Sequence, residues 1–95
     1  MDKINFNKAL EFHQKNNLDK AIAEYKKILK LCDKDETLNF YLGTAYLQKK
    51  NYANAEKYLH IALSINNDNF HDQLIEIVSA FPSDTKLAIL KKILE

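Results

Sequence analysis

Glycine, proline and cysteine are nearly absent from this 95-residue chain, which has one residue of each. Glycine and proline supply many of the backbone conformations at which chains reverse, so their scarcity favours long helices with few turns. The lone cysteine, Cys32, cannot form an internal disulfide, which points to a reducing compartment, and we expect a cytoplasmic protein. One glycine also excludes a glycine-rich loop that could cradle a phosphate.

The chain also lacks an excess of charge and any long apolar run. Fourteen basic residues face thirteen acidic ones, which leaves a formal charge of +1 and no strong field to attract nucleic acid or anionic lipid. No apolar run approaches the ~18 residues of a membrane span, and Lys3, Asn5 and Lys8 interrupt the region where a signal peptide would lie. We therefore expect neither nucleic acid as a partner nor a membrane-spanning segment.

The residues most often used in catalysis are few and scattered. The histidines His13, His60 and His71 and the single Cys32 do not stand at the spacing of a metal site or a catalytic triad on one helix face. His71 and Asp72 are adjacent, so on a helix their side chains point in different directions. The sequence therefore predicts no enzyme activity, no cofactor and no metal.

Apolar residues recur at spacings of three and four through most of the chain, which is the pattern of amphipathic helices. Asn16 and Asn17 mark the first turn, because asparagine tolerates the left-handed conformation that ends helices. The polar loop Asp33-Lys34-Asp35 holds a capping residue for the next helix, and Ser83 is a candidate cap with Pro82 just before it. The pattern predicts helices over residues 4–15, 18–31, 38–48, 52–65, 70–81 and 84–95.

The sequence repeats itself at a period of 34 residues. Self-similarity at a fixed period is typical of stacked structural repeats, in which each unit buries its apolar face against the next. Identical residues recur in the pairs Asn5 and Asn39, Phe6 and Phe40, Gln14 and Gln48, Lys15 and Lys49, Asn17 and Asn51, Ala21 and Ala55, and Leu29 and Leu63.

The shared residues resemble the motif of the tetratricopeptide repeat, a helix-turn-helix unit of this length. That motif has a small residue, an aromatic residue three positions later, then alanine and an aromatic residue four positions after it. The copies here read Ala9-x2-Phe12…Ala21-x3-Tyr25 and Leu42-Gly43-x2-Tyr46…Ala55-x3-Leu59. The usual Trp position holds Asn5 and Asn39, and the usual terminal Pro position holds Asp33 and Asn67.

The resemblance implies an all-α solenoid of about six helices, built from right-handed stacking of antiparallel helix hairpins. We expect one domain over residues 1–95, with repeat one at 2–35, repeat two at 36–69 and a degenerate third repeat or capping hairpin at 70–95. In that last segment Ile77 stands where the motif has a small residue.

The resemblance also implies a function, because the first helix of each hairpin lines a concave surface in this family. Carried over, the lining is Lys3, Phe6, Asn7, Leu10 and His13, then Thr37, Phe40, Tyr41, Thr44 and Gln48, then His71, Leu74, Ile75 and Val78. This stripe is unusually apolar, which is typical of an interaction site. We expect a non-catalytic adaptor, scaffold or chaperone-like module that holds a peptide or amphipathic helix. The predicted contact residues are Phe6, Leu10, Phe40, Tyr41, Leu74 and Ile75.

One alternative concerns the two phenylalanines of that stripe. Phe6 and Phe40 can instead pack between neighbouring first helices as part of the core.

Another known role of the family does not fit this chain. Some members grip acidic chaperone tails with a clamp of Lys, Asn, Asn, Lys and Arg, whose charge-assisted bonds hold a carboxylate. The matching positions hold Phe6, Leu10, Tyr41, His71 and Ile75, which supply neither a permanent cation nor an amide.

Two other functions stay open from the sequence. The chain can be the N-terminal targeting domain of a larger enzyme, such as the glycosyltransferases or kinases that carry such repeats. It can also self-associate through its last helix, on which apolar residues cover an arc of about 160°. These residues are Leu87, Ile89, Leu90, Ile93 and Leu94.

Overall fold

The computed structural model describes residues 3–65 and 71–94 of the chain. Within these ranges the protein is all-α, as predicted, with six helices and no strand. None of these helices is both long enough and apolar enough to cross a membrane. The helices are α1 (Lys3–Gln14), α2 (Leu18–Leu29), α3 (Glu36–Gln48), α4 (Tyr52–Ile65), α5 (His71–Val78) and α6 (Ser83–Leu94).

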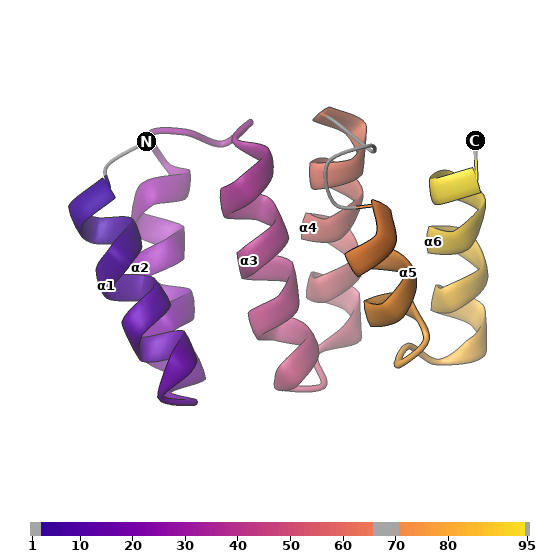
Figure 1. Cartoon of the computed structure of the whole chain (residues 1–95), viewed down its shortest axis with the longest axis horizontal. Coiled ribbons are helices and arrows are strands. Elements are labelled where there is room, and N and C mark those ends of the chain that lie inside the picture. Colours follow the sequence, from indigo (N-terminus) through magenta and orange to yellow (C-terminus); the bar gives the residue numbers. More distant parts are fainter. Residues whose placement is uncertain (1–2, 66–70, 95) are drawn as a thin grey trace.

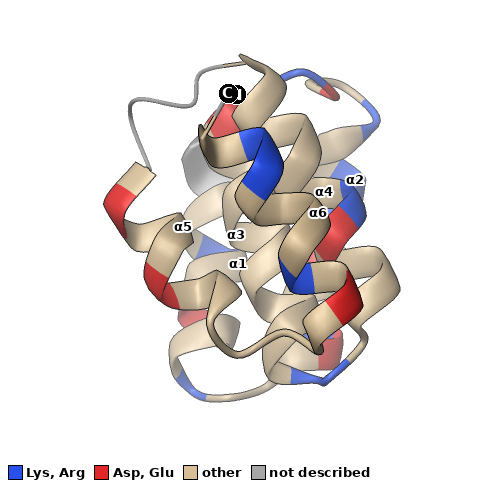
Figure 2. Ribbon diagram, turned by 90° about the vertical axis from the view of Figure 1, so that its right-hand side faces the viewer, with Lys and Arg blue, Asp and Glu red and all other residues tan. Residues whose placement is uncertain are grey.

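The helices form three antiparallel hairpins that stand side by side along the long axis of the molecule (Figure 1). Helices α1, α3 and α5 lie on one face of this row, and α2, α4 and α6 lie on the other (Figures 1 and 2). Helix α2 packs on α3 and so joins the first hairpin to the second. This is the arrangement of a helical-repeat solenoid, and it places the first helix of every hairpin on a common face.

The first two hairpins turn in the same way, at positions 34 residues apart. Asn16 and Lys50 have left-handed backbones, with φ of 61° and 63°. In each turn the N–H of the next residue donates to the carbonyl five residues back, at 2.8 Å in the first turn and 2.9 Å in the second. These bonds satisfy carbonyls that a helix end leaves free, in the Schellman arrangement. The prediction of a left-handed turn at the asparagine pair is therefore confirmed at Asn16.

Small residues allow the two helices of a hairpin to approach closely. Ala9 on α1 is completely buried, and Gly43 holds the matching position on α3. A Cβ atom added at Gly43 would lie only 2.7 Å from Cγ of Leu59 on α4. Tyr46 and Tyr58 stack beside this contact, with their ring centroids 5.7 Å apart.

A buried asparagine holds the loop between the first and second hairpins. The Asn39 side-chain amide donates to the backbone carbonyls of Asp33 and Asp35, at 3.1 and 2.8 Å. The Asp35 carboxylate accepts from the N–H of Leu38 at 2.9 Å, so Asp35 is the capping residue that the sequence predicted within this loop. At Asn39 the tetratricopeptide motif usually has Trp, so here hydrogen bonds replace a large apolar side chain.

The third hairpin differs from the first two. Helix α5 ends at Val78, three residues before the predicted end, and α6 contacts α4 as well as α5. Helix α6 begins at Ser83, and the carbonyl of Pro82 accepts from the N–H of Lys86 at 2.8 Å. The prediction of Ser83 as the N-cap is therefore wrong, because Pro82 occupies that position and already fixes the backbone there. The predicted helix start at Phe70 lies outside the described residues.

Candidate functional site

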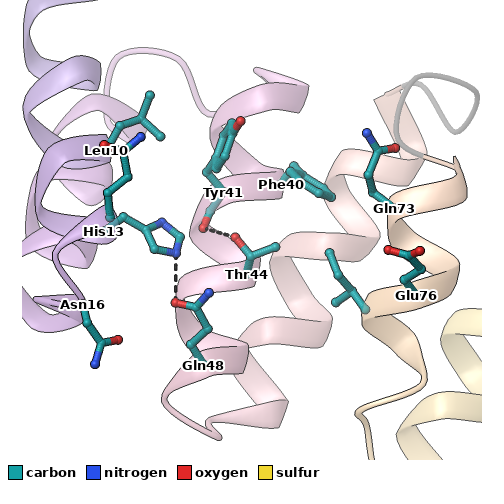
Figure 3. A pocket seen from close by; sticks show the side chains of 11 residues that line it. Leu10, His13, Asn16, Phe40, Tyr41, Thr44, Gln48, Gln73 and Glu76 are labelled. Carbon is teal, nitrogen blue, oxygen red and sulfur yellow. Dashed lines mark hydrogen bonds between the residues drawn. The ribbon is translucent and has the colours of Figure 1, made fainter.

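A groove of about 660 Å³ crosses the face formed by the first helices (Figure 3). Its floor belongs to α3, with α1 on one side and α5 on the other, so all three hairpins contribute to it. None of its lining residues comes from α6, so the last helix of the chain does not fill it. The lining residues are Leu10, His13, Gln14, Asn16, Phe40, Tyr41, Thr44, Gln48, Gln73, Glu76 and Ile77.

Aromatic rings support the floor of the groove. Tyr41 is half-buried on α3, and its ring packs edge-on against Phe6 and Phe40, with centroids 5.7 and 5.6 Å apart. The Thr44 hydroxyl donates to the Tyr41 carbonyl at 2.8 Å within the same helix. Edge-to-face ring pairs of this kind add stability beyond the area that they bury. The floor is thus a rigid aromatic surface whose upper side is open to the groove.

His13 joins three helices at one wall of the groove. Its Nε2 lies 3.1 Å from Oε1 of Gln48 on α3, and its Nδ1 lies 2.9 Å from the hydroxyl of Tyr25 on α2. With Gln48 oriented as an acceptor, Nε2 carries the hydrogen, and Nδ1 accepts the Tyr25 hydroxyl hydrogen. Burial lowers the pKa of His13, partly offset by its hydrogen bond to Gln48. Burial and the nearby Tyr41 raise the pKa of Tyr25. Both groups are neutral near pH 7, so His13 adds no positive charge to the groove.

The predicted contact residues fall into three groups. Leu10 and Tyr41 are half-buried and line the groove, and Phe40 touches it although it is buried. Phe6 and Leu74 are buried, with 9% and 0% of their surface exposed, so the surface of a partner does not reach Leu74 in this arrangement. Ile75 is exposed but does not line the groove. Phe6 thus packs between helices, as in the alternative that the sequence left open, and Phe40 combines burial with contact to the groove.

The face that α5 shows to the groove was not predicted. Its lining residues are Gln73, Glu76 and Ile77, whereas the 34-residue period pointed to Leu74, Ile75 and Val78. Ile77 takes the place of Ala9 and Gly43, and its side chain is too large for the close contact made there. Leu74 is buried like its counterparts Phe6 and Phe40, whereas Val78 is buried where Leu10 and Thr44 are half-buried, and Ile77 lines the groove. The oversized residue was the available signal, since it predicts that α5 packs differently from α1 and α3.

The groove is consequently less apolar than the sequence indicated. Four of its lining residues are aliphatic or aromatic, and the other seven are polar or charged. His13, Thr44 and Gln48 lie in it as expected, and Gln14, Asn16, Gln73 and Glu76 add polar groups that were not expected. Among the described residues, no group of three His, Cys, Asp or Glu side chains is placed to hold a metal ion.

Repeated hairpins whose first helices share one groove define a helical-repeat scaffold. A family model described as TPR repeat matches residues 9–50, and a second, described as Tetratricopeptide repeat, matches residues 38–69. The two matches together span residues 9–69, and the chain belongs to the tetratricopeptide repeat family. Repeats of this family generally mediate protein–protein interactions and are typically non-catalytic. No curated protein and no solved structure matches the chain at a significant level.

Proposed function

We propose that this protein binds a segment of a partner protein in the groove between α1, α3 and α5, as a non-catalytic adaptor, scaffold or chaperone-like module. The free Cys32 supports a reducing, cytoplasmic setting for this role. The family typically acts through such interactions.

The continuity of the groove over three helices carries the proposal. Its volume of about 660 Å³ lies within the range of ~300–1,000 Å³ that is usual for ligand sites. An aromatic floor flanked by polar side chains is typical of surfaces that orient a bound chain, because the rings supply contact area and the polar groups supply direction.

A photo-crosslinking amino acid at Gln73 tests the proposal directly. Gln73 is exposed and lines the groove, whereas Ala23 is exposed on α2, outside it, and serves as the matched control position. In native cells we expect a crosslinked protein from the Gln73 position that the Ala23 position does not give. Crosslinks of equal yield and identity from both positions would contradict binding in the groove.

A blocking variant gives the second test. Thr44 lies at the floor and its hydroxyl bonds only to a carbonyl of its own helix, so Thr44→Arg fills the groove while removing little that stabilises the fold. We expect it to abolish the crosslink from Gln73 and to keep the helical circular dichroism and the melting temperature. A crosslink that survives in this variant would place the partner elsewhere.

Self-association through α6 is a second candidate, because this helix presents a stripe of leucines. Leu87 and Leu94 are 62% and 78% exposed, and the half-buried Leu90 lies between them at helical spacing. Sedimentation velocity over a hundredfold range of concentration tests it. A concentration-dependent dimer that Leu87→Glu abolishes would support this role, and a strict monomer throughout would remove it.

A further inference from the structure

The groove contains an isolated negative charge. Glu76 on α5 is the only lining residue with a full charge near pH 7, since burial lowers the pKa of His13 and keeps it neutral, and no lysine lines the groove. The ion pairs in the described part of the chain involve the carboxylates of Glu11, Asp19 and Glu24, and Asp72 lies 3.7 Å from Nδ1 of His71, a contact that is an ion pair only when His71 is protonated. None of them uses Glu76, whose carboxylate is left facing an uncharged groove.

No basic residue of α5 faces the groove beside Glu76. Helix α5 contains Asp72 and Glu76 and no lysine. Viewed from the α5–α6 end of the molecule, the charged positions of α5 are all acidic, whereas lysines appear along α6 beside it (Figure 2). Glu76 and Gln73 stand on the α5 wall across the groove from Leu10 and His13 (Figure 3). A ligand that crosses from α1 to α5 therefore meets its only charged contact at Glu76.

Side-chain amides supply most of the remaining polar lining. Gln14, Asn16, Gln48 and Gln73 each carry two N–H donors and an acceptor oxygen. The oxygen of Gln48 already accepts from His13, so its amide donors remain for a ligand. Amides of this kind match the N–H and C=O groups of an extended main chain, which have no partners of their own. A helix bonds those groups internally and would leave the groove amides without a matching partner.

We infer that the groove takes an extended, basic segment, in which a lysine or arginine pairs with Glu76 and a neighbouring apolar side chain rests on the ring of Tyr41. The inference rests on the proposed function and names the chemical class of its partner. Charge complementarity selects the basic side chain, the amides bond the backbone, and the aromatic floor accepts the apolar side chain. A segment with an acidic residue at the same place is rejected by Glu76.

Selection from a random dodecapeptide phage library tests this chemistry without a known partner. The immobilised full chain is the bait, and Thr44→Arg is used for counter-selection, so that only peptides bound in the groove are kept. We expect the retained peptides to be enriched in lysine or arginine beside an apolar residue. Fluorescence anisotropy with the most enriched peptide then measures the affinity for each variant.

Two acidic residues of α5 form a matched pair of variants. Asp72 lies on the same helix, four residues before Glu76, and does not line the groove. We expect Glu76→Gln to weaken binding by about three- to fivefold and Glu76→Lys by more than tenfold, whereas Asp72→Asn leaves it unchanged. Raising the salt concentration should weaken binding by the unaltered chain and have less effect on Glu76→Gln. Methylating single backbone amides of the peptide should also weaken binding.

The outcomes separate the inference from the proposed function. Retained peptides without enrichment in basic residues, or equal affinity for Glu76→Lys and the unaltered chain, would overturn the inference and leave binding in the groove intact. If counter-selection on Thr44→Arg removes every peptide that binds the unaltered chain, binding in the groove would be contradicted, and the inference with it. Full retention of affinity by the methylated peptides would overturn the extended conformation.

Discussion

The second and third hairpins pack their helices together with different residues at matching positions. In the second, Gly43 lets α3 approach α4 until there is no room for a Cβ atom. In the third, Ile77 occupies the same place in the period and its side chain lines the groove. Val78 is buried there, whereas its counterpart Thr44 is half-buried. The size of the residue at this place thus differs together with the set of side chains that the first helix shows to the groove.

The turns of the hairpins differ in the same way. Asn16 and Lys50 adopt left-handed backbones that end α1 and α3, and their helices are 12 and 13 residues long. The described part of the third hairpin has no such residue, and successive N–H groups bond to carbonyls three residues back before Pro82. Helix α5 has 8 residues. Loss of the small residue and loss of the left-handed turn therefore occur together.

Exchanging the residue at the close contact should have the largest effect. Gly43→Ile places the side chain of the third hairpin into the second, where it overlaps Leu59. We expect the free energy of unfolding to fall by about 3 kcal/mol, because the core is overpacked at a site without free space. Urea unfolding followed by circular dichroism measures it. Surface substitutions usually change stability by no more than about 0.5 kcal/mol. A change of that size for Gly43→Ile would show that the contact with Leu59 does not determine how α3 packs on α4.

The buried asparagine comes next. Asn39→Ala removes two hydrogen bonds to carbonyls of the loop, and we expect a loss of about 2 kcal/mol in urea unfolding. Asn5 holds the matching position of the first hairpin and is exposed, so Asn5→Ala should cost less than about 0.5 kcal/mol. Equal losses at the two positions would mean that burial does not distinguish them.

Substitutions at the left-handed turns should have a smaller effect, and they should raise the free energy of unfolding instead of lowering it. Lysine has no special tolerance for positive φ, so Lys50→Gly should raise the free energy of unfolding by about 1 kcal/mol. Asn16→Gly should raise it by less, because asparagine already tolerates this conformation. Thermal unfolding of the two variants makes the comparison, and a destabilised Lys50→Gly protein would contradict the backbone argument.

The pH dependence contributed by His13 should be the smallest effect, because the residue is only half-buried. The folded protein lowers the pKa of His13, whereas an unfolded chain has a value of about 6.5. The unfolded state therefore binds more protons below that pH, so this contribution is full above about 6.5 and is lost as the pH falls through the folded value. Urea unfolding at a series of pH values should show that the free energy of unfolding declines less steeply with falling pH in His13→Gln. An unchanged decline would show that His13 does not contribute to the pH dependence of stability.

The sequence predicted most of the fold, because the helices and their caps depend on local patterns. The helix over residues 52–65 has its predicted bounds, and Asp35 caps α3 as expected. The orientation of α5 could not be read from the period alone, because extending the 34-residue shift to this helix ignores the volume of Ile77. The role of Asn39 depends on loop carbonyls whose positions only the folded chain supplies.

The candidate site was predicted in its location and only partly in its chemistry. Leu10, Tyr41, His13 and Gln48 lie in the groove because α1 and α3 follow the period. Hydrophobicity alone did not separate side chains that face the groove from side chains that fill the space between helices. Phe6 and Leu74 fill the space between helices. Gln73, Glu76 and Ile77 line the groove from α5, and the period did not predict this set.

The position of His13 has a consequence for how much the groove changes shape when a partner binds as proposed. By contacting both Tyr25 and Gln48, this side chain links α1 to α2 and α3. A segment bound as proposed would therefore meet an α1–α3 half of the groove that is already held together, and little conformational entropy would be lost there on association. We expect encounter with this half to resemble docking onto a rigid template, with backbone shifts within about 1 Å between the free and bound states.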